Sequence, residues 1–261
     1  MALIKTKEEI AIMREGGALL SRALQAALDA AKPGVPMRDL DALATKVIED
    51  GGGISSFRGY HDGGEGTPYP ATLCISRNQE IVHGIGTREE VLEEGDIVGF
   101  DIGCWYKGLC TDMAATKLIG PVSEERRELA KATKQALHAG LKMIHAGIFV
   151  TDIGAAVEDS VDKKRFGIVR ALVGHGVGHA VHEDPNIPNY RTKRTPKLEL
   201  APGMCLAIEP MLTSGGDDIE TTSDGWTIET ADGSDAAHFE VTVAVTEQGY
   251  DLLTPEPHVE L

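Results

Sequence analysis

The sequence contains an internal duplication, and this feature constrains the fold more than any other. Three pairs of short segments occur in the same order in both parts of the chain: residues 34–40 and 147–153, 83–86 and 175–178, and 95–101 and 203–209. The second pair reads HGIG and HGVG, and each member of the third is a glycine followed by an apolar run that ends in a carboxylate. Repeats of this kind indicate duplicated structural units. We therefore expect two related halves that face each other and bring equivalent strand ends to a shared centre.

The predicted elements follow the same order in both halves, with two helices before several strands. Apolar spacing predicts a first helix that ends near Pro33-Gly34 and a second at 39–50. Strands are expected at 71–76, 97–104 and 113–119, followed by helices at 123–144 and 151–165 and strands at 169–173, 204–208, 226–230 and 238–245. Since 261 residues suit one large domain, we expect a single domain over residues 1–261, with halves of about 1–120 and 121–250.

Charge and composition exclude several classes of protein. The formal net charge of -16 argues against a specific nucleic-acid-binding function, because phosphate contacts require clustered Lys and Arg. No run approaches the roughly eighteen apolar residues of a membrane helix, and the first residues do not resemble a secretory signal. The four cysteines have no CxxC spacing and are too few for a disulfide framework. We therefore expect a cytoplasmic protein without membrane association.

Four acidic residues lie within or at the ends of apolar strands, where a buried charge is costly unless it is compensated. Asp101 and Glu209 each end an apolar run, Glu240 lies inside another, and Asp112 follows a turn that returns the chain toward Asp101. Basic residues that could pair with them are absent from these strands. Because crowded carboxylates repel one another, divalent cations are the natural compensation. Two ions that share bridging carboxylates can use all four.

His175 adds a nitrogen ligand, and the glycines of the segment GHGVG around it allow close approach of the backbone. A set of two Asp, two Glu and one His is rich in oxygen and suits Mn²⁺, Fe²⁺, Co²⁺ or Zn²⁺. Two such ions lower the pKa of a shared water and polarise a carbonyl group, so the pattern indicates a metal-dependent hydrolase. His83, in the matching HGIG segment, and His182, seven residues after His175, are further candidates for the site.

These residues and their order resemble the methionine aminopeptidases. The resemblance rests on residues 95–112 with Asp101 and Asp112, on GHGVG at 174–178, on residues 204–211 with Glu209, and on Phe239-Glu240-Val-Thr, and it spans residues 4 to about 250. It implies the pita-bread fold of the α+β class, with two αβ halves related by a pseudo-twofold axis around curved antiparallel sheets. Glu240 lies 31 positions after Glu209, which leaves no room for the helical insertion of type II enzymes and indicates type I.

The resemblance implies a role for each metal ligand. Asp101 would bind one of two divalent metal ions (Co, Mn, Fe or Zn), and Asp112 and Glu240 would bridge both. His175 and Glu209 would complete the ligands of the other ion, and Glu209 would also transfer the catalytic proton.

The resemblance also implies how substrate is recognised. His83 would contact the scissile amide, and His182 would contact the carbonyl oxygen or the oxyanion that it becomes. The methionine side chain would enter a pocket formed by Phe57, Tyr60, Tyr69, Cys74 and Trp226. The expected activity is removal of the initiator methionine from nascent chains whose second residue is small, by a monomer for which the ribosome is a candidate site of action.

The chain departs from the family pattern at three places. The loop 62–68 is longer than in most relatives, and the assignment of Tyr69 to the methionine pocket depends on where the extra residues are placed. Val181 stands where an aromatic residue is common, and His238 stands where Gln is usual. The size of the methionine pocket and the hydrogen bonds around the metal ligands are therefore expected to differ from those of most family members.

Two alternatives to methionine removal stay open. An aminopeptidase P or prolidase-like Xaa-Pro hydrolase would have the same fold, but such enzymes usually carry an added amino-terminal domain, for which 261 residues leave no length. A metal-free pita-bread protein could serve as a binding module. That reading gives no physical reason to retain a cluster of buried carboxylates.

Overall fold

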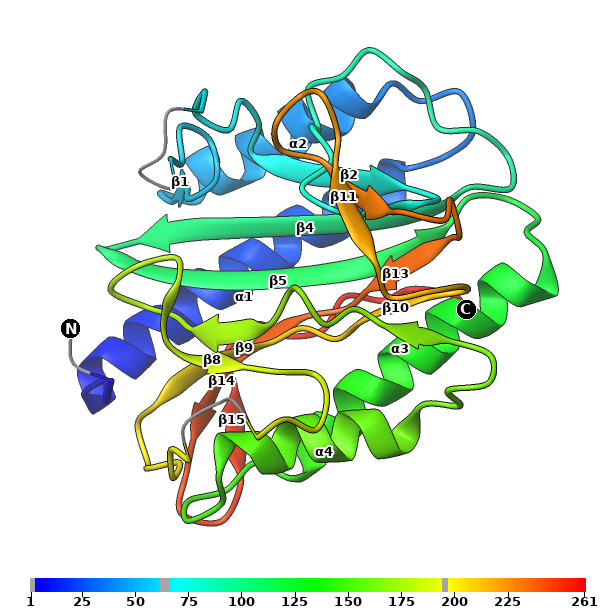
Figure 1. Cartoon of the computed structure of the whole chain (residues 1–261). Helices are drawn as coiled ribbons and strands as arrows, with labels where there is room; N and C mark the ends of the chain where they lie inside the picture. Colours follow the sequence, from blue (N-terminus) through cyan, green and yellow to red (C-terminus); the bar gives the residue numbers. More distant parts are fainter. Residues whose placement is uncertain (1–2, 62–65, 194–196) are drawn as a thin grey trace.

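A computed structural model describes residues 3–61, 66–193 and 197–261. The first half begins with two helices, and five strands follow: α1 (Lys7–Ala30), α2 (Met37–Asp50), β1 (Ile54–Ser55), β2 (Leu73–Arg77), β3 (Glu80–Val82), β4 (Ile97–Tyr106) and β5 (Leu109–Leu118). The second half repeats this order (Figure 1) with α3 (Glu124–Lys142), α4 (Val150–Ser160), β6 (Gly167–Ile168), β7 (Gly174–Gly176), β8 (Glu183–Ile187), β9 (Cys205–Ile208), β10 (Met211–Thr213), β11 (Ile219–Thr221), β12 (Ile228–Thr230), β13 (Ala236–His238), β14 (Val241–Val245) and β15 (Tyr250–Leu252). The predicted helix-helix-strand repeat is confirmed.

Two antiparallel sheets form the frame of the molecule. In the first, β4 pairs with β1, β2 and β5, and in the second the order is β15-β14-β9-β7-β8. A bridge joins the two sheets at their centre, where the N–H of Glu240 donates to the carbonyl of Ala114 at 2.9 Å and the reverse bond measures 3.2 Å. Strand β12 also pairs with β3 of the other half. The halves therefore share backbone hydrogen bonds as well as packed side chains.

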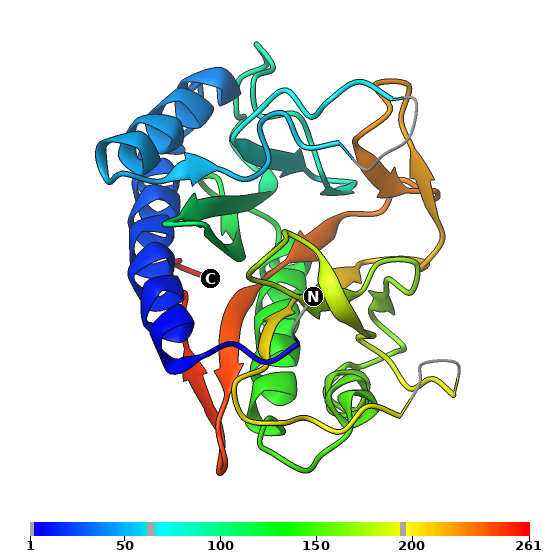
Figure 2. The same cartoon turned by 90° about the vertical axis from the view of Figure 1, so that its left-hand side faces the viewer.

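Each sheet is covered by its own pair of helices, as Figure 2 shows. Helix α1 packs along β4 and β5, and α3 packs against β9, β10 and β13. Both helices start at a capping side chain, Thr6 for α1 and Ser123 for α3, which accepts a backbone N–H of the first turn. Of the helices that the structure describes, none combines the length and the apolar character that a bilayer crossing needs.

The predicted strand at 169–173 is wrong. Strand β6 ends at Ile168 and β7 begins at Gly174, and the residues between them have no strand structure. Leu172 and Val173 instead line a cavity between the two sheets. The predicted strand at 238–245 is also divided, since β13 ends at His238 and β14 begins at Val241. In both places the strand structure is interrupted where the chain lines the cavity.

A buried ion pair ties the amino-terminal segment to the first residue of β8. Lys5 Nζ lies 2.5 Å from Glu183 Oε2, and both side chains are almost fully buried. The other carboxylate oxygen of Glu183 accepts the backbone N–H groups of His179 and Ala180. Because every oxygen of this carboxylate is satisfied, the pair tolerates burial. It holds the turn that separates His175 from His182.

Candidate metal centre

The antiparallel hairpin of β4 and β5 places two of the predicted ligands on one face. Asp101 and Gly103 point to the same side of β4, because side chains alternate along a strand. Gly103 pairs with Asp112 across the hairpin, so the two aspartates are diagonal neighbours on that face. The second sheet supplies its ligands in the same manner.

In the second sheet, β9 lies between β7 and β14. His175 pairs with Ala207, so Glu209, two residues further on, shares its face. Val241 pairs with Ile208, and continuing this antiparallel register sets Glu240 opposite Glu209. The result is a distance of 3.3 Å between His175 Nε2 and Glu209 Oε1. The structure therefore brings all five residues predicted as ligands to the wall of one cavity of about 210 Å³.

Burial controls the protonation of the four carboxylates. Exclusion from water raises the pKa of Asp101 from 3.8 to about 7. Burial, together with repulsion from neighbouring carboxylates, raises the pKa values of Asp112, Glu209 and Glu240 well above their usual range. Without a cation, this cluster would hold protons at neutral pH. The cost of burying four negative charges together also favours the binding of divalent ions, which replace those protons.

The imidazole of His175 presents its Nε2 to the carboxylate of Glu209. Burial lowers its pKa to about 3, so the ring is neutral. Its Nδ1 lies 2.9 Å from the carbonyl oxygen of Gly176, to which it can only donate. The proton is therefore on Nδ1, and the lone pair of Nε2 faces a carboxylate oxygen of Glu209. Two acceptors at this distance repel each other unless a metal ion or a proton lies between them.

Several buried polar atoms of the site lack a hydrogen-bond partner within the described part of the chain, namely Asp101 Oδ1, Glu240 Oε1 and His238 Nε2. Ligand atoms of Asp112, His175 and Glu240 also lie within 4.8 Å of one another. Buried polar atoms are rarely left unpaired in native proteins. The residues present therefore fit a divalent metal site.

Both additional histidines line the same cavity. His83 follows β3 with a φ of 59°, a conformation that is uncommon for residues with a side chain. Burial lowers its pKa to about 4, and it is neutral. The ring of His182 lies 4.5 Å from that of His175, and its Nδ1 lies 2.9 Å from the hydroxyl of Tyr60.

The five residues predicted for the methionine pocket also line this cavity: Phe57, Tyr60, Tyr69, Cys74 and Trp226. Tyr69 packs edge-on against Trp226, with 5.3 Å between the ring centroids, and its hydroxyl donates to the carbonyl of Gly84. The indole N–H of Trp226 donates to the carbonyl of Thr67. Residues 62–65 of the long loop lie outside the described residues. The hydrogen bonds of the Tyr69 hydroxyl and the Trp226 indole fix the orientation of these two rings in the cavity wall.

Sequence reasoning missed part of the cavity wall. Val82, Leu172, Val173, Asn186 and Met211 also line it. The apolar side chains among them are equally compatible with core positions, and Asn186 lies in no motif, so no pattern marked these residues. The one available signal was proximity in sequence, because Val173 lies two residues before His175 and Met211 two residues after Glu209.

Comparison with known proteins identifies the family. The model of the family described as "Metallopeptidase family M24" matches residues 11–247. The chain belongs to metallopeptidase family M24. It is 44% identical to the methionine aminopeptidase of Clostridium acetobutylicum over 97% of this chain and 99% of that protein. The crystal structure of methionine aminopeptidase from Thermotoga maritima is 40% identical and superimposes with a TM-score of 0.91, over 97% of this chain and 99% of that one.

These similarities confirm the resemblance to methionine aminopeptidases and the pita-bread fold. A more distant solved structure, that of the Xaa-Pro dipeptidase from Bacillus anthracis, is 25% identical with a TM-score of 0.77. It covers 99% of this chain, but this chain covers only 63% of it. Between Glu209 and Glu240, all of which the structure describes, the chain forms strands and no helix. This agrees with the spacing that predicted type I.

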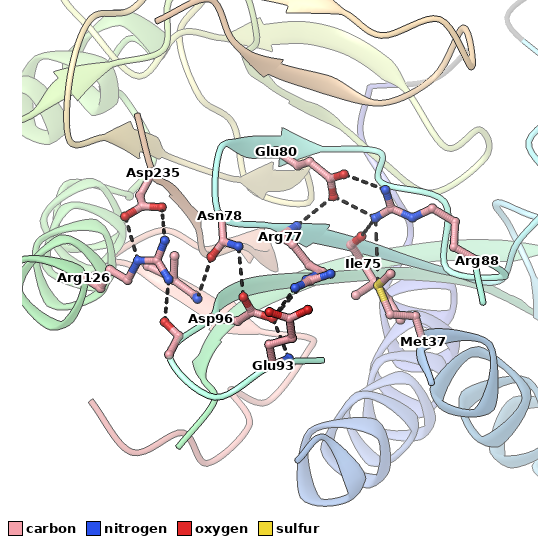
Figure 3. Close-up of polar contacts among 12 residues, drawn as sticks. Met37, Ile75, Arg77, Asn78, Glu80, Arg88, Glu93, Asp96, Arg126 and Asp235 are labelled. Carbon is pink, nitrogen blue, oxygen red and sulfur yellow. Dashed lines mark hydrogen bonds and ion pairs between the residues drawn. The ribbon is translucent and has the colours of Figure 1, made fainter. Parts of the chain in front are cut away.

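A partly buried ion pair between Arg88 and Glu80 lies beside β3 in this M24 enzyme (Figure 3). The guanidinium of Arg88 donates to both carboxylate oxygens of Glu80, at 2.5 and 2.7 Å, and to the carbonyl of Ile75 at 2.8 Å. Glu80 in turn accepts the backbone N–H of Arg77. Arg88 thereby connects β2 with β3, and His83 directly follows β3. We infer that the pair positions His83.

Replacing Arg88 by Met is expected to lower kcat about tenfold, because the sequence predicts that His83 contacts the scissile amide and a small displacement of such a group costs rate. The free energy of unfolding should fall by about 1–3 kcal/mol, because Glu80 loses its charged partner. Kinetics and urea unfolding measure these effects. Arg38→Met is the matched control, since Arg38 pairs with Glu89 on the exposed surface. An unchanged kcat with reduced stability would show that Arg88 only supports the fold.

Proposed function

We propose that this chain is a methionyl aminopeptidase that removes the amino-terminal methionine of nascent proteins and peptides, preferentially when the second residue is small. One observation carries the proposal. A single cavity joins a cluster of four buried carboxylates and His175 to a wall of aromatic and sulfur-containing side chains. The cluster suits hydrolysis of a peptide bond, and the wall suits an unbranched apolar side chain such as methionine.

The proposed metal centre holds two divalent ions. Asp101 would hold one ion, Asp112 and Glu240 would be shared by both, and His175 with Glu209 would hold the other. The oxygen-rich donor set suits Co²⁺, Mn²⁺, Fe²⁺ or Zn²⁺. When bound, such ions polarise the scissile carbonyl and make water a stronger nucleophile at neutral pH.

Three side chains complete the proposed chemistry. Glu209 takes a proton from the attacking water and delivers it to the leaving amine, a role that its raised pKa supports. With the Tyr60 hydroxyl donating to Nδ1, neutral His182 carries its proton on Nε2 and can stabilise negative charge on the carbonyl oxygen. His83 contacts the scissile amide. Glu209 is buried and His83 is half-buried, and electrostatic interactions are stronger there than in water.

The proposed specificity is tested with two classes of peptide. Incubation with Mn²⁺ or Co²⁺ is expected to release methionine from Met-Ala-Ser at a rate at least tenfold above cleavage of Xaa-Pro peptides, because the apolar wall recognises the first side chain. Liquid chromatography of the products measures both rates. Preferential Xaa-Pro cleavage would support the prolidase-like alternative, and the absence of any cleavage in metal-loaded protein would favour a binding module.

The proposed activity also suggests a domain organisation, an oligomeric state and a compartment. We propose that residues 1–261 form one catalytic domain that acts as a monomer on nascent chains in the cytoplasm, where the ribosome is a candidate partner. Four free buried cysteines agree with a reducing compartment.

A further inference from the structure

His238 is a histidine of the cavity wall to which the proposed mechanism gives no role. It ends β13 and is almost fully buried. Its backbone is held in place, because its N–H donates to Thr116 Oγ1 and its carbonyl accepts the same hydroxyl. Its Nε2 lies 3.8 Å from Glu209 Oε2 and 3.9 Å from Glu240 Oε2.

These two distances exclude direct hydrogen bonds, which require about 2.7–3.2 Å between nitrogen and oxygen. Nε2 is also fully buried and has no hydrogen-bond partner among the described residues. Such an arrangement is costly unless another group satisfies the nitrogen. The arrangement needs an occupant between the imidazole and the two carboxylates.

A metal ion meets this requirement. Nitrogen and oxygen ligands lie about 2.0–2.2 Å from an ion such as Zn²⁺, so two ligand atoms on one ion are at most about 4.4 Å apart. The separations of His238 Nε2 from Glu209 and from Glu240 are both below this limit. Glu209 then lies between two imidazoles, since its other oxygen faces His175.

We propose that His238 Nε2 is an additional ligand of the metal centre and shares one ion with Glu209 and Glu240. The inference rests on the metal centre of the proposed function but not on its substrate. It raises the number of imidazole ligands from one to two. Imidazole favours Zn²⁺, Co²⁺ and Fe²⁺ over Mn²⁺, which prefers oxygen. The centre therefore selects ions that accept nitrogen ligands.

The direct test counts imidazoles in the unmodified protein. The metal-free protein is loaded with Zn²⁺ to saturation, and X-ray absorption spectroscopy measures the histidine ligands for each pair of ions. Two imidazoles per pair are expected, from His175 and His238. A single imidazole, or the absence of bound zinc, would overturn the proposal. Because this measurement needs no variant, it does not depend on whether a mutant folds.

The variant His238→Gln tests the contribution to affinity. Competition with a chromophoric chelator should show zinc affinity reduced about 10- to 100-fold, the range found when groups that support a metal site are removed, with a smaller loss for Mn²⁺. His145→Gln, which changes an exposed histidine, should leave both affinities unaltered. Equal zinc affinity in the wild-type protein and His238→Gln would contradict the proposal. Failure of Met-Ala-Ser cleavage alone would instead reject the proposed function.

Discussion

Glu209→Gln is expected to lower kcat for methionine release by roughly a thousandfold, within the range attributed to general acid–base groups. The amide has nearly the shape of the carboxylate but can neither accept the proton of the attacking water nor deliver it to the leaving amine. The fold should survive, because the pKa of Glu209 is raised by burial and by the charges of Asp101 and Asp112, and the substitution removes that repulsion.

Steady-state kinetics with Met-Ala-Ser and metal analysis of the same sample distinguish the two roles proposed for Glu209. Loss of turnover with at least one ion still bound indicates proton transfer, whereas loss of both ions indicates a ligand role alone. Glu220→Gln is the matched control, because it makes the same change at an exposed position in the same half of the chain. Residual activity within tenfold of wild type would reject the assignment of Glu209.

Removal of the metals is expected to abolish turnover and to make stability depend on pH. In the metal-free protein the folded-state pKa of Asp101 is about 7, above its ordinary value of 3.8. The neutral carboxyl is favoured on folding, so its contribution is fully present below about pH 4 and is lost as the pH rises through 7. For Asp101 alone this corresponds to roughly 4 kcal/mol, and the other three carboxylates act in the same direction.

Calorimetry of metal-free and metal-loaded protein between pH 5 and 8 measures the effect. The metal-free protein should melt roughly 10 °C lower at pH 8 than at pH 5, and metal ions should largely remove this difference. Asp112→Asn with Glu240→Gln should flatten the curve of the metal-free protein. The control pair Asp218→Asn with Glu220→Gln removes the same charge from the exposed surface. If both pairs of substitutions flattened the pH dependence of the melting temperature equally, general charge repulsion in this acidic protein would be its cause, and not the carboxylate cluster.

The helices and the longest strands were predictable from local pattern. Apolar spacing located α1, α2, α3 and the hairpin of β4 and β5, since each helix buries one continuous face and the two strands are buried along most of their length. Helix α4 was predicted too long, because Val161 is extended and the chain turns at Asp162. The strand predicted at 169–173 was wrong, because apolar residues that line a cavity have the composition of a buried strand.

The sequence by itself determined the family, the duplicated fold and the five residues that the structure gathers around one cavity. It could do so because carboxylates in apolar strands are costly, and the duplication indicates where their strands meet. Only the tertiary structure decided how Arg88 holds the turn of His83 and how His238 faces Glu209 and Glu240. These relations join residues far apart in the chain, as β12 pairs with β3. Such contacts arise from packing and have no local pattern, so the position of His238 relative to the metal centre required the folded molecule.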